Sequence, residues 1–340
     1  MSGTLRWGIL GTGGIAHAQT TDLIGNGFTV TAVGSRSQAN ADSFAREFGI
    51  RTAHGSYESL VADPNVDVIY VSTPHPFHAA NALLALNAGK HVLVEKPFAT
   101  NAAAAREVVA LAEARQLIVL EAMWTRFLPH MVRIREIIAA GTLGAVRTLI
   151  ADHGQLLPAD PEHRIRNPAL GGGALLDLGI YPVSFAYDLF GSPSSVQASA
   201  SMTATGVDRQ TAILFGYGDG QQAVLQTALD ALGPNTASII GMAGRIEIES
   251  VWYSPTSFTV YGSDNAVIER FEQPVANRGM QYQAWELERL ARAGLTASEI
   301  LPPEESVRII ETLDQIRRQI GLSYPGEGRP TSAPGRAAHR

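Results

Sequence analysis

The sequence predicts an α/β protein in two parts, in which an N-terminal doubly wound parallel sheet is followed by an α+β part with a largely antiparallel sheet. Over the first third of the chain, short apolar runs alternate with helical segments, as in parallel sheets that are covered on both faces. A glycine-rich turn joins the first apolar run to the first helix. After Gly144, one strand pattern follows another with turns such as 217–220 between them, which is typical of hairpins.

Capping and terminating residues set the limits of the elements in the first part. Ser37 can cap a helix, Gly49 and Gly89 can end one, and Pro74 ends a strand. The expected strands are 5–10, 28–34, 67–73, 91–95 and 117–121. The expected helices are 15–24, 37–48, 77–88 and a fourth that runs to 114 after a cap at Thr100 or Asn101.

The second part begins near residue 122, where the alternation of strand and helix stops. We expect a first domain over 1–121, a second over 122–324, and a disordered Gly/Pro/Arg-rich tail over 325–340. Strands are expected at 145–155, 196–203, 210–217, 222–230, 238–241, 245–249 and 258–261. Helices are expected at 131–140, 282–293 and 303–320.

Composition excludes several classes of function. The formal net charge is −6 and no basic run is present, so a surface for nucleic acid or for an anionic membrane is not expected. The absence of cysteine removes disulfides, thiolate metal sites and cysteine nucleophiles. The N-terminus lacks a signal-peptide pattern and no transmembrane helix is expected, so the sequence predicts a soluble cytoplasmic protein.

The turn after the first strand has the form of a dinucleotide fingerprint, G-x-G-x-x-A. It reads Gly11-Thr12-Gly13-Gly14-Ile15-Ala16. Gly11 permits the tight turn, Gly13 lets a pyrophosphate approach the backbone, and Ala16 is small enough for the helix to pack on the strand. The helix N-terminus offers free N–H groups to the phosphates. The alternative is a purely structural turn, which the strand before and the helix after make less favoured.

The end of the second strand favours NADP over NAD. An NAD site usually places an acidic residue there to bind the ribose 2′-hydroxyl. This chain reads Gly34-Ser35-Arg36-Ser37, with no carboxylate. Ser35 can donate to a 2′-phosphate, and Arg36 can pair with it or lie over the adenine. A solvated surface arginine is the alternative for Arg36.

Lysine usage singles out one residue. Of the 26 basic residues only Lys90 and Lys96 are lysines. Lys96 follows the expected strand 91–95, so it should face the crevice at the carboxyl ends of the strands, as Gly13 and Arg36 do. There it can hold a substrate oxygen or lower the pKa of a neighbouring acid. Pro97, which follows it, is compatible with a cis peptide. A solvent-facing lysine is the alternative.

A second polar site is indicated where three glycines, 171–173, run into a helical segment. Asp177 and Tyr181 are four residues apart, so they share one face of this apolar helix. A tyrosine can move a proton when a nearby cation lowers its pKa, and Lys96 is the obvious cation. The alternative, a core tyrosine with a satisfied hydroxyl, is equally consistent with the spacing alone.

Together these motifs resemble the glucose-fructose oxidoreductase/inositol dehydrogenase/MocA family over nearly the whole chain. The motifs are GTGGIA, STPHPFH, AGKHVLVEKP and GGGALLDLGIY. The stretches at 121–129 and 167–181 and the closing helix are similar to the branch of dimeric dihydrodiol dehydrogenase and NADP-linked D-xylose 1-dehydrogenase. Many members carry histidine four residues after the aspartate, where this chain has Tyr181, which weakens an assignment to inositol dehydrogenase.

The resemblance implies a Rossmann domain and a C-terminal domain with an open, mainly antiparallel sheet that makes a homodimer or homotetramer interface. It implies catalytic roles for Lys96, Asp177 and Tyr181. It also implies cofactor contacts for Thr73, Pro74, His78, Glu95, Lys96, Pro97, Trp124 and Arg164. His17, His75, His130 and His153 are interpreted as ordinary polar residues.

The predicted function is an NADP-dependent oxidoreductase that transfers a hydride between nicotinamide and a carbinol carbon of a sugar or a cyclic trans-diol. Tyr181 would move the proton, Lys96 would stabilise the oxygen and lower the pKa of Tyr181, and Asp177 would orient the substrate hydroxyl or Lys96. No metal is needed. Oxidation of an aldose at C1 to a lactone is preferred, with a sugar 3-dehydrogenase or a keto-sugar reductase as alternatives. A non-catalytic NADP-sensing regulator is the alternative of another class.

Overall fold

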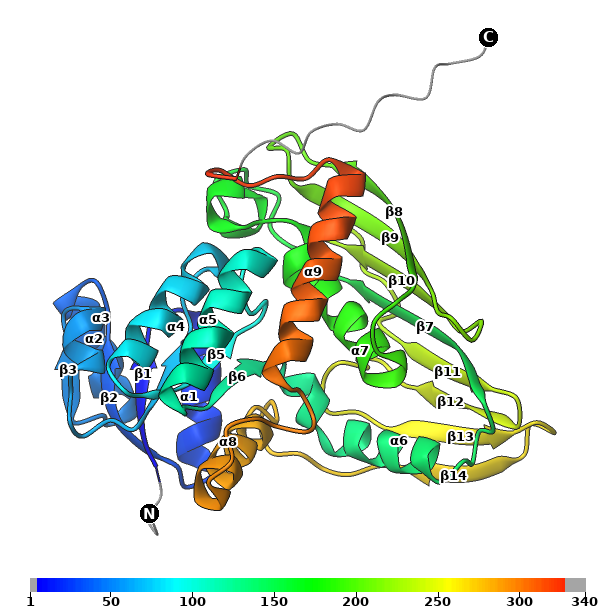
Figure 1. Cartoon of the computed structure of the whole chain (residues 1–340), viewed down its shortest axis with the longest axis horizontal. Helices are drawn as coiled ribbons and strands as arrows, with labels where there is room; N and C mark the ends of the chain where they lie inside the picture. The colour runs from blue at the N-terminus through cyan, green and yellow to red at the C-terminus, as the bar shows by residue number, and fades with distance from the viewer. Residues whose placement is uncertain (1–4, 328–340) are drawn as a thin grey trace.

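Two β-sheets organise the chain. In the computed structural model, which describes residues 5–327, a six-stranded sheet and an eight-stranded sheet lie on either side of helix α9 (Pro303–Ile320) (Figure 1). The first sheet is parallel and the second is mostly antiparallel, as the sequence predicts. Of the expected tail 325–340, residues 328–340 lie outside the described part, whereas Glu327 accepts a hydrogen bond from the Tyr324 amide at 3.0 Å.

The first sheet has the strand order β3-β2-β1-β4-β5-β6, which is the doubly wound order of dinucleotide-binding domains. Its strands are β1 (Arg6–Leu10), β2 (Thr29–Gly34), β3 (Thr52–His54), β4 (Val68–Val71), β5 (His91–Glu95) and β6 (Val119–Ala122). Its helices are α1 (Gly14–Gly25), α2 (Gln38–Phe48), α3 (Tyr57–Val61), α4 (His78–Asn87) and α5 (Ala102–Arg115). The sequence patterns missed β3 and α3, because three and five residues are too few to show a period.

The helix ends form where the capping chemistry indicates. The Ser37 side chain accepts from the Asn40 amide at the start of α2, and Gly49 ends that helix in the left-handed region at φ 67°. At the start of α5 the cap is Asn101, whose Oδ1 accepts from the Ala104 amide at 3.0 Å, so Thr100 is not the cap.

The second sheet has the order β14-β13-β12-β11-β7-β10-β9-β8, and within it β7 and β10 pair in parallel. Its strands are β7 (Val146–Gly154), β8 (Ser195–Met202), β9 (Asp208–Gly216), β10 (Gln222–Ala228), β11 (Ala237–Gly241), β12 (Gly244–Ile248), β13 (Phe258–Gly262) and β14 (Val267–Phe271). The sequence analysis missed β14, an edge strand with no fully buried residue and therefore no apolar run.

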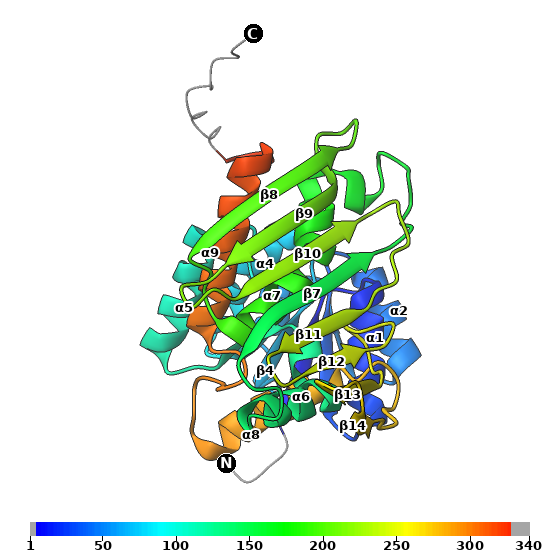
Figure 2. The ribbon, with the colours of Figure 1, turned by 90° about the vertical axis from the view of Figure 1, so that its right-hand side faces the viewer.

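Helices cover one face of the second sheet. They are α6 (Pro129–Ala139), α7 (Ile180–Phe190) and α9, while the broad strands β8, β9, β10 and β7 show their other face in Figure 2. Among the described residues, the segment Pro168–Phe190 is long and apolar enough to cross a membrane, but 89% of its window is buried inside the protein. Packing between the sheet and its neighbours therefore accounts for its apolar character.

The last two helices return to the first sheet. Helix α8 (Gln281–Ala293) lies against α1, where the Gln283 side-chain amide donates to Gln19 at 2.9 Å. It also contacts β1, where Glu288 accepts from the Trp7 indole at 3.2 Å. Helix α9 lies against α5, and Asp314 accepts from the Ala102 amide at 2.9 Å. These contacts join the chain after residue 280 to the dinucleotide-binding half, and the division at 121/122 stays a prediction.

A buried carboxylate holds the start of the helix that carries Asp177 and Tyr181. The helix begins with a π-helical turn, η5 (Leu175–Gly179), which continues into α7. Asp208 on β9 is fully buried, and its Oδ2 accepts from the Leu175 amide at 2.8 Å and from the Thr211 hydroxyl at 2.7 Å. Its Oδ1 has no hydrogen-bond partner among the described residues. Burial raises the pKa of Asp208 to about 6.

This pKa predicts how an Asp208→Asn variant differs from the wild type in stability. Between the pKa of Asp208 in the unfolded chain, about 4, and its pKa of about 6 in the folded protein, the folded state binds this proton more tightly than the unfolded state does. The free energy of unfolding of the wild type therefore falls as the pH rises through this range. The variant lacks this contribution. The difference in unfolding free energy between variant and wild type should therefore shift in favour of the variant by up to about 3 kcal/mol over that range.

Urea unfolding at several pH values between about 4 and 7 measures this difference. Thr211→Val serves as the comparison, because it removes one hydrogen bond to Asp208 and leaves the carboxyl in place. Parallel stability curves for Asp208→Asn and wild type would contradict the assignment.

Candidate functional site

One cavity of about 860 Å³ runs along the carboxyl ends of the parallel strands and collects most of the predicted site residues. The predicted residues that line it are Gly11, Thr12, Gly13, Gly14, Ile15, Ser35, Arg36, Thr73, Pro74, His78, Glu95, Lys96, Trp124, Arg164, Asp177 and Tyr181. Ala16 and Pro97 do not line it. Ala16 is fully buried between α1 and the sheet, and Pro97 turns the chain after Lys96 through a cis peptide.

The start of α1 is shaped to receive a diphosphate. Gly13 is the N-terminal cap of the helix, and no side chain caps the first amides. A Cβ at Gly13 or Gly14 would meet nothing within 4 Å, so these positions border open space rather than packed protein. Gly11, in contrast, has φ +111°, and a Cβ there would lie 2.8 Å from the Ser72 hydroxyl. Free amides, open space and the helix dipole together fit the diphosphate of a dinucleotide.

The adenosine end of the cavity carries a cation and hydroxyl groups. Ser35, Arg36, Ser37, Asn40 and Tyr57 line it. The Ser37 amide donates to Ser35 Oγ at 3.4 Å, and burial raises the pKa of Tyr57, an effect that the charge of Arg36 opposes. Among the described lining residues the only carboxylates are Glu95 and Asp177, which lie beside Lys96. This end therefore suits a 2′-phosphate better than a free 2′-hydroxyl.

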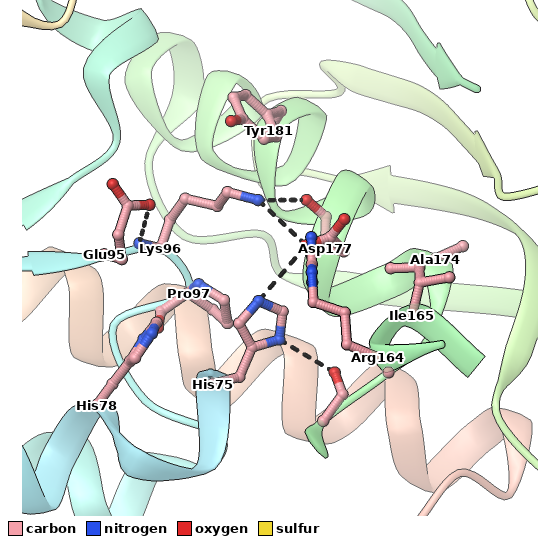
Figure 3. A network of polar contacts seen from close by, with 12 residues as sticks. His75, His78, Glu95, Lys96, Pro97, Arg164, Ile165, Ala174, Asp177 and Tyr181 are labelled. Atoms are coloured by element: carbon pink, nitrogen blue, oxygen red, sulfur yellow. Dashed lines mark hydrogen bonds and ion pairs between the residues drawn. The ribbon is translucent and has the colours of Figure 1, made fainter. Parts of the chain in front are cut away.

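Lys96 lies in the middle of the cavity and reaches the second domain (Figure 3). Its Nζ donates to the Asp177 carbonyl at 2.7 Å, lies 3.5 Å from Asp177 Oδ1, and sits 5.0 Å from the centroid of the Tyr181 ring. Burial acts to lower the pKa of Lys96, but the neighbouring Asp177, Tyr181 and Glu95 outweigh it and raise the pKa. Lys96 therefore carries its proton at neutral pH.

Two cations and a histidine lie around the Asp177 carboxylate. Besides Lys96, the Arg164 guanidinium lies 3.2 Å from Oδ1, and His75 Nε2 lies 3.5 Å from the same oxygen. Burial acts to raise the pKa of Asp177, but Lys96, His75 and Arg164 hold it well below its usual range. The sequence motifs did not predict a site role for His75, which is interpreted from sequence as an ordinary polar residue. Its position, immediately after Thr73 and Pro74 at the end of β4, is the signal that could have placed it there.

Tyr181 lies one turn further along the same helix and faces Trp124. The Trp124 indole donates to the Tyr181 hydroxyl oxygen at 3.0 Å, which leaves the hydroxyl proton available to a substrate. Burial raises the pKa of Tyr181, and the charge of Lys96 only partly opposes this rise. The predicted direction of the Lys96 effect is therefore right, but the predicted net lowering of the pKa is wrong. Tyr181 keeps its proton at neutral pH.

Two further predicted residues, Glu95 and His78, contact the chain on either side of Lys96. Glu95 accepts from the Tyr70 hydroxyl at 2.5 Å and from the Lys96 amide at 3.2 Å, and burial raises its pKa to about 7. The two ring nitrogens of His78 lie 2.8 Å from the Pro97 carbonyl and 2.7 Å from the Thr73 carbonyl. Burial lowers the pKa of His78 to about 3. The neutral imidazole has one N–H and donates to one of these two carbonyls.

Five lining residues of the cavity were indicated by no motif. They are His153, Gln155, Leu157, Tyr253 and Arg278, and we call them the far wall. The rings of His153 and Tyr253 stack with centroids 3.7 Å apart, and the Gln155 amide nitrogen lies 3.3 Å from the Tyr253 hydroxyl and 2.8 Å from His153 Nε2. Tyr253 is about 100 positions from His153 and Gln155 in sequence, so only the folded chain brings them together.

Comparison with known proteins places both halves of the chain in one family. The family described as oxidoreductase family, NAD-binding Rossmann fold, matches residues 5–123, and the GFO/IDH/MocA C-terminal domain matches residues 131–247. The chain is 38% identical to mouse trans-1,2-dihydrobenzene-1,2-diol dehydrogenase over 96% of this chain and 99% of that protein. It is 36% identical to the NADP⁺-linked D-xylose 1-dehydrogenase of Hypocrea jecorina over 95% and 93% of the two chains.

Solved structures of two oxidoreductases have similar folds. A 3-ketoreductase from Actinomadura kijaniata, in complex with NADP and TDP-benzene, superposes with a TM-score of 0.82 at 26% identity, over 94% of this chain and 98% of that chain. The aldose-aldose oxidoreductase of Caulobacter crescentus, complexed with glycerol, gives a TM-score of 0.83 at 25% identity, over 93% and 97%.

The open space at Gly13 predicts a variant that folds but does not bind a dinucleotide. In Gly13→Val the Cβ meets no protein atom within 4 Å, and φ −82° suits any residue, so thermal stability should change little. The added methyl groups fill the space above the first amides of α1, so binding of NADPH should weaken by about 100-fold or more.

NADPH fluorescence titration and a thermal melt check the two halves of this prediction. Gly218→Val is the matched control, because a Cβ at Gly218 also meets nothing within 4 Å and Gly218 lies outside the cavity. Wild-type affinity in Gly13→Val would show that the dinucleotide binds elsewhere.

Proposed function

Because the chain belongs to the Gfo/Idh/MocA oxidoreductase family, we propose that it is an NADP-dependent oxidoreductase of sugar or cyclic-diol CH–OH groups. The observation that carries this proposal is the cluster of Lys96, Asp177 and Tyr181 in the dinucleotide cavity, a charged cation beside a phenol that holds its proton. Named relatives act on a dihydrodiol and on D-xylose, and their identity of 36–38% spans nearly the whole chain.

The cofactor preference follows from the adenosine end of the cavity. Arg36 and Ser35 lie where a 2′-phosphate would be bound, and no acidic residue is present there to select NAD. Gly11, Gly13 and the first amides of α1 would hold the diphosphate. When bound, NADP⁺ accepts a hydride from the carbinol carbon, and the alcohol becomes a carbonyl.

The protein's own contribution is the handling of the hydroxyl proton. In the oxidative direction the deprotonated Tyr181 receives the proton of the substrate hydroxyl as the C–H bond breaks, and in the reductive direction the neutral phenol donates that proton to the carbonyl oxygen. The Lys96 ammonium, held by the Asp177 carbonyl, stabilises negative charge on the substrate oxygen. Asp177 acts by orienting Lys96 rather than by touching the reacting carbon, since its oxygen faces Lys96, Arg164 and His75.

An aldose oxidised at C1 to its lactone is the substrate that we favour. A cyclic aldose offers a hydroxyl at C1 for Tyr181 and Lys96, and the stacked rings of Tyr253 and His153 give a flat surface for a sugar ring. Reduction of a keto-sugar is the second candidate. It is favoured by the protonated state of Tyr181, which can donate directly to a carbonyl oxygen, and by the structural similarity to a 3-ketoreductase.

The pH dependence of oxidation tests the proton-transfer role. The rate of aldose oxidation with NADP⁺ should rise with pH, because Tyr181 holds its proton at neutral pH. In Lys96→Met the pKa of Tyr181 rises further, so this increase should move to higher pH, and Tyr181→Phe should lower kcat by about 100-fold or more. The absorbance of the reduced nicotinamide, followed from pH 6 to 10 with a panel of aldoses and cyclic diols, measures both effects.

The second lysine provides the control for this experiment. Lys90 donates to the Asp63 and Val66 carbonyls at 2.8 and 2.6 Å, outside the cavity, so Lys90→Met should leave the shape of the pH profile unchanged. Wild-type activity in Tyr181→Phe, or a profile of Lys96→Met shifted to lower pH, would contradict the mechanism. A faster reaction with NAD⁺ than with NADP⁺ would contradict the proposal that Ser35 and Arg36 bind a 2′-phosphate.

We also propose that the outer face of the second sheet joins copies of this chain. On that face the register places Val224 of β10 directly beside Ile150 of β7 and Leu214 of β9. Val224 and Ile150 are 45% and 47% exposed. They belong to the strands β10 and β7 of the open face of the second sheet (Figure 2). An extended face of this kind provides a flat isologous contact for a dimer.

Light scattering on a size-exclusion column tests this assembly. The wild type should have a mass of two or more times the 36.2 kDa of one chain, and Val224→Glu should reduce this mass. Ile24→Glu, at a 40% exposed position on α1, is the control that should leave the mass unchanged. A monomeric wild type would overturn the proposal.

A further inference from the structure

Positively charged side chains outnumber carboxylates among the residues that line the cavity. Four cations line it, namely Arg36, Lys96, Arg164 and Arg278. Lys96 and Arg164 share the Asp177 carboxylate, and Arg36 lies with Ser35 and Tyr57 at the adenosine end. Arg278 forms no ion pair with any residue between 5 and 327. An exposed guanidinium without a carboxylate in a cavity wall is a ready site for an anion.

The backbone that carries Arg278 is held in place against α1. Asp22 accepts from the Met280 amide at 2.7 Å and lies 3.5 Å from the Arg278 amide nitrogen. The Gln19 side chain donates to the Met280 carbonyl at 3.4 Å. The Arg278 side chain therefore leaves a fixed segment, and less conformational freedom is lost when it binds a ligand.

The Arg278 guanidinium lies beside Trp124, which contacts Tyr181. Its central carbon lies 5.7 Å from the centroid of the Trp124 ring, and the indole of Trp124 donates to the Tyr181 hydroxyl. Arg278 also shares the cavity wall with Tyr253, whose ring stacks on His153. A sugar ring beside Tyr181 would thus share the cavity with Trp124, Arg278 and Tyr253.

We propose that Arg278 selects an anionic sugar, binding a carboxylate or phosphate on the part of the molecule remote from the reacting carbon. The planar guanidinium can hold two oxygens of either oxyanion, while Gln155 and Tyr253 offer amide and hydroxyl groups to the ring hydroxyls. The oxyanion takes no part in the hydride or proton transfer and keeps its charge throughout. This proposal rests on the proposed sugar oxidoreductase function.

A set of related sugars, one neutral and two that carry an anionic group, tests the proposal. kcat/KM for glucose, glucuronate and glucose 6-phosphate is measured for wild type, Arg278→Gln and Arg278→Lys at two salt concentrations. The wild type should prefer one of the anionic sugars over glucose by about tenfold or more. Arg278→Gln should lower this ratio by about tenfold, mainly through KM, and Arg278→Lys should restore part of it. Comparing glucuronate with glucose 6-phosphate shows whether the oxyanion is a carboxylate or a phosphate.

Arg289→Gln is the matched control, because Arg289 is half exposed on α8, pairs with Glu286, and lies outside the cavity. It should leave the ratio unchanged. Calorimetric titration of each sugar into the protein saturated with NADPH keeps the two proposals separate. Binding of an anionic sugar that depends on Arg278, without turnover, would support the anion site while contradicting the proposed reaction. A preference for glucose, or equal losses for all three sugars in Arg278→Gln, would overturn the anion site.

Discussion

The buried charge of Asp177 is the constraint on which the site depends. Its carboxylate is 7% exposed, and a carboxylate in such a place is costly unless cations and donors surround it. Lys96 comes from the loop after β5, His75 from the loop after β4, and Arg164 from the second domain. The three groups must meet at one oxygen for the charge to be tolerated. Folding of the ion cluster and assembly of the site are therefore one event.

This cluster also determines which groups carry protons. Lys96 is charged and Asp177 is ionised, because each stabilises the charged form of the other. His78 and His153 have pKa values of about 3, because both are buried, so they remain neutral and leave Lys96 as the cation nearest Tyr181. Tyr181 retains its proton under the same burial. The result is a positively charged pocket with one available phenolic proton, which suits the reversible transfer of a hydride and a proton.

Two buried polar side chains, Arg126 and Glu121, fix the segments that carry Trp124 and Lys96 relative to the rest of the fold. Arg126 is 2% exposed and donates to Ser184 Oγ at 3.0 Å and to the Ser184 carbonyl at 2.7 Å, so the turn after β6 is tied to the helix of Tyr181. Glu121 accepts from the Phe98 amide at 2.9 Å and from the Ser306 hydroxyl at 2.6 Å, which ties the chain after Lys96 to α9. Such contacts are local in space but span up to 185 residues in sequence.

The sequence by itself determined the architecture and the residues that its motifs mark. Gly11, Gly13, Lys96, Asp177 and Tyr181 were identifiable because backbone freedom, a rare lysine and helical spacing are properties of short segments. Strand alternation likewise depends on neighbouring residues, so both sheets were predicted, apart from β3 and β14 at their edges.

Only the tertiary structure decided the protonation of the site and the composition of its far wall. The pKa of Tyr181 depends on burial, which outweighs the nearby charge of Lys96 and cannot be read from spacing. His153, Tyr253 and Arg278 reach the cavity from separate loops and strands, and no local pattern distinguishes them from ordinary polar residues. Burial and long-range contact are properties of the folded chain as a whole, and for this reason they became visible only when its distant segments were placed side by side.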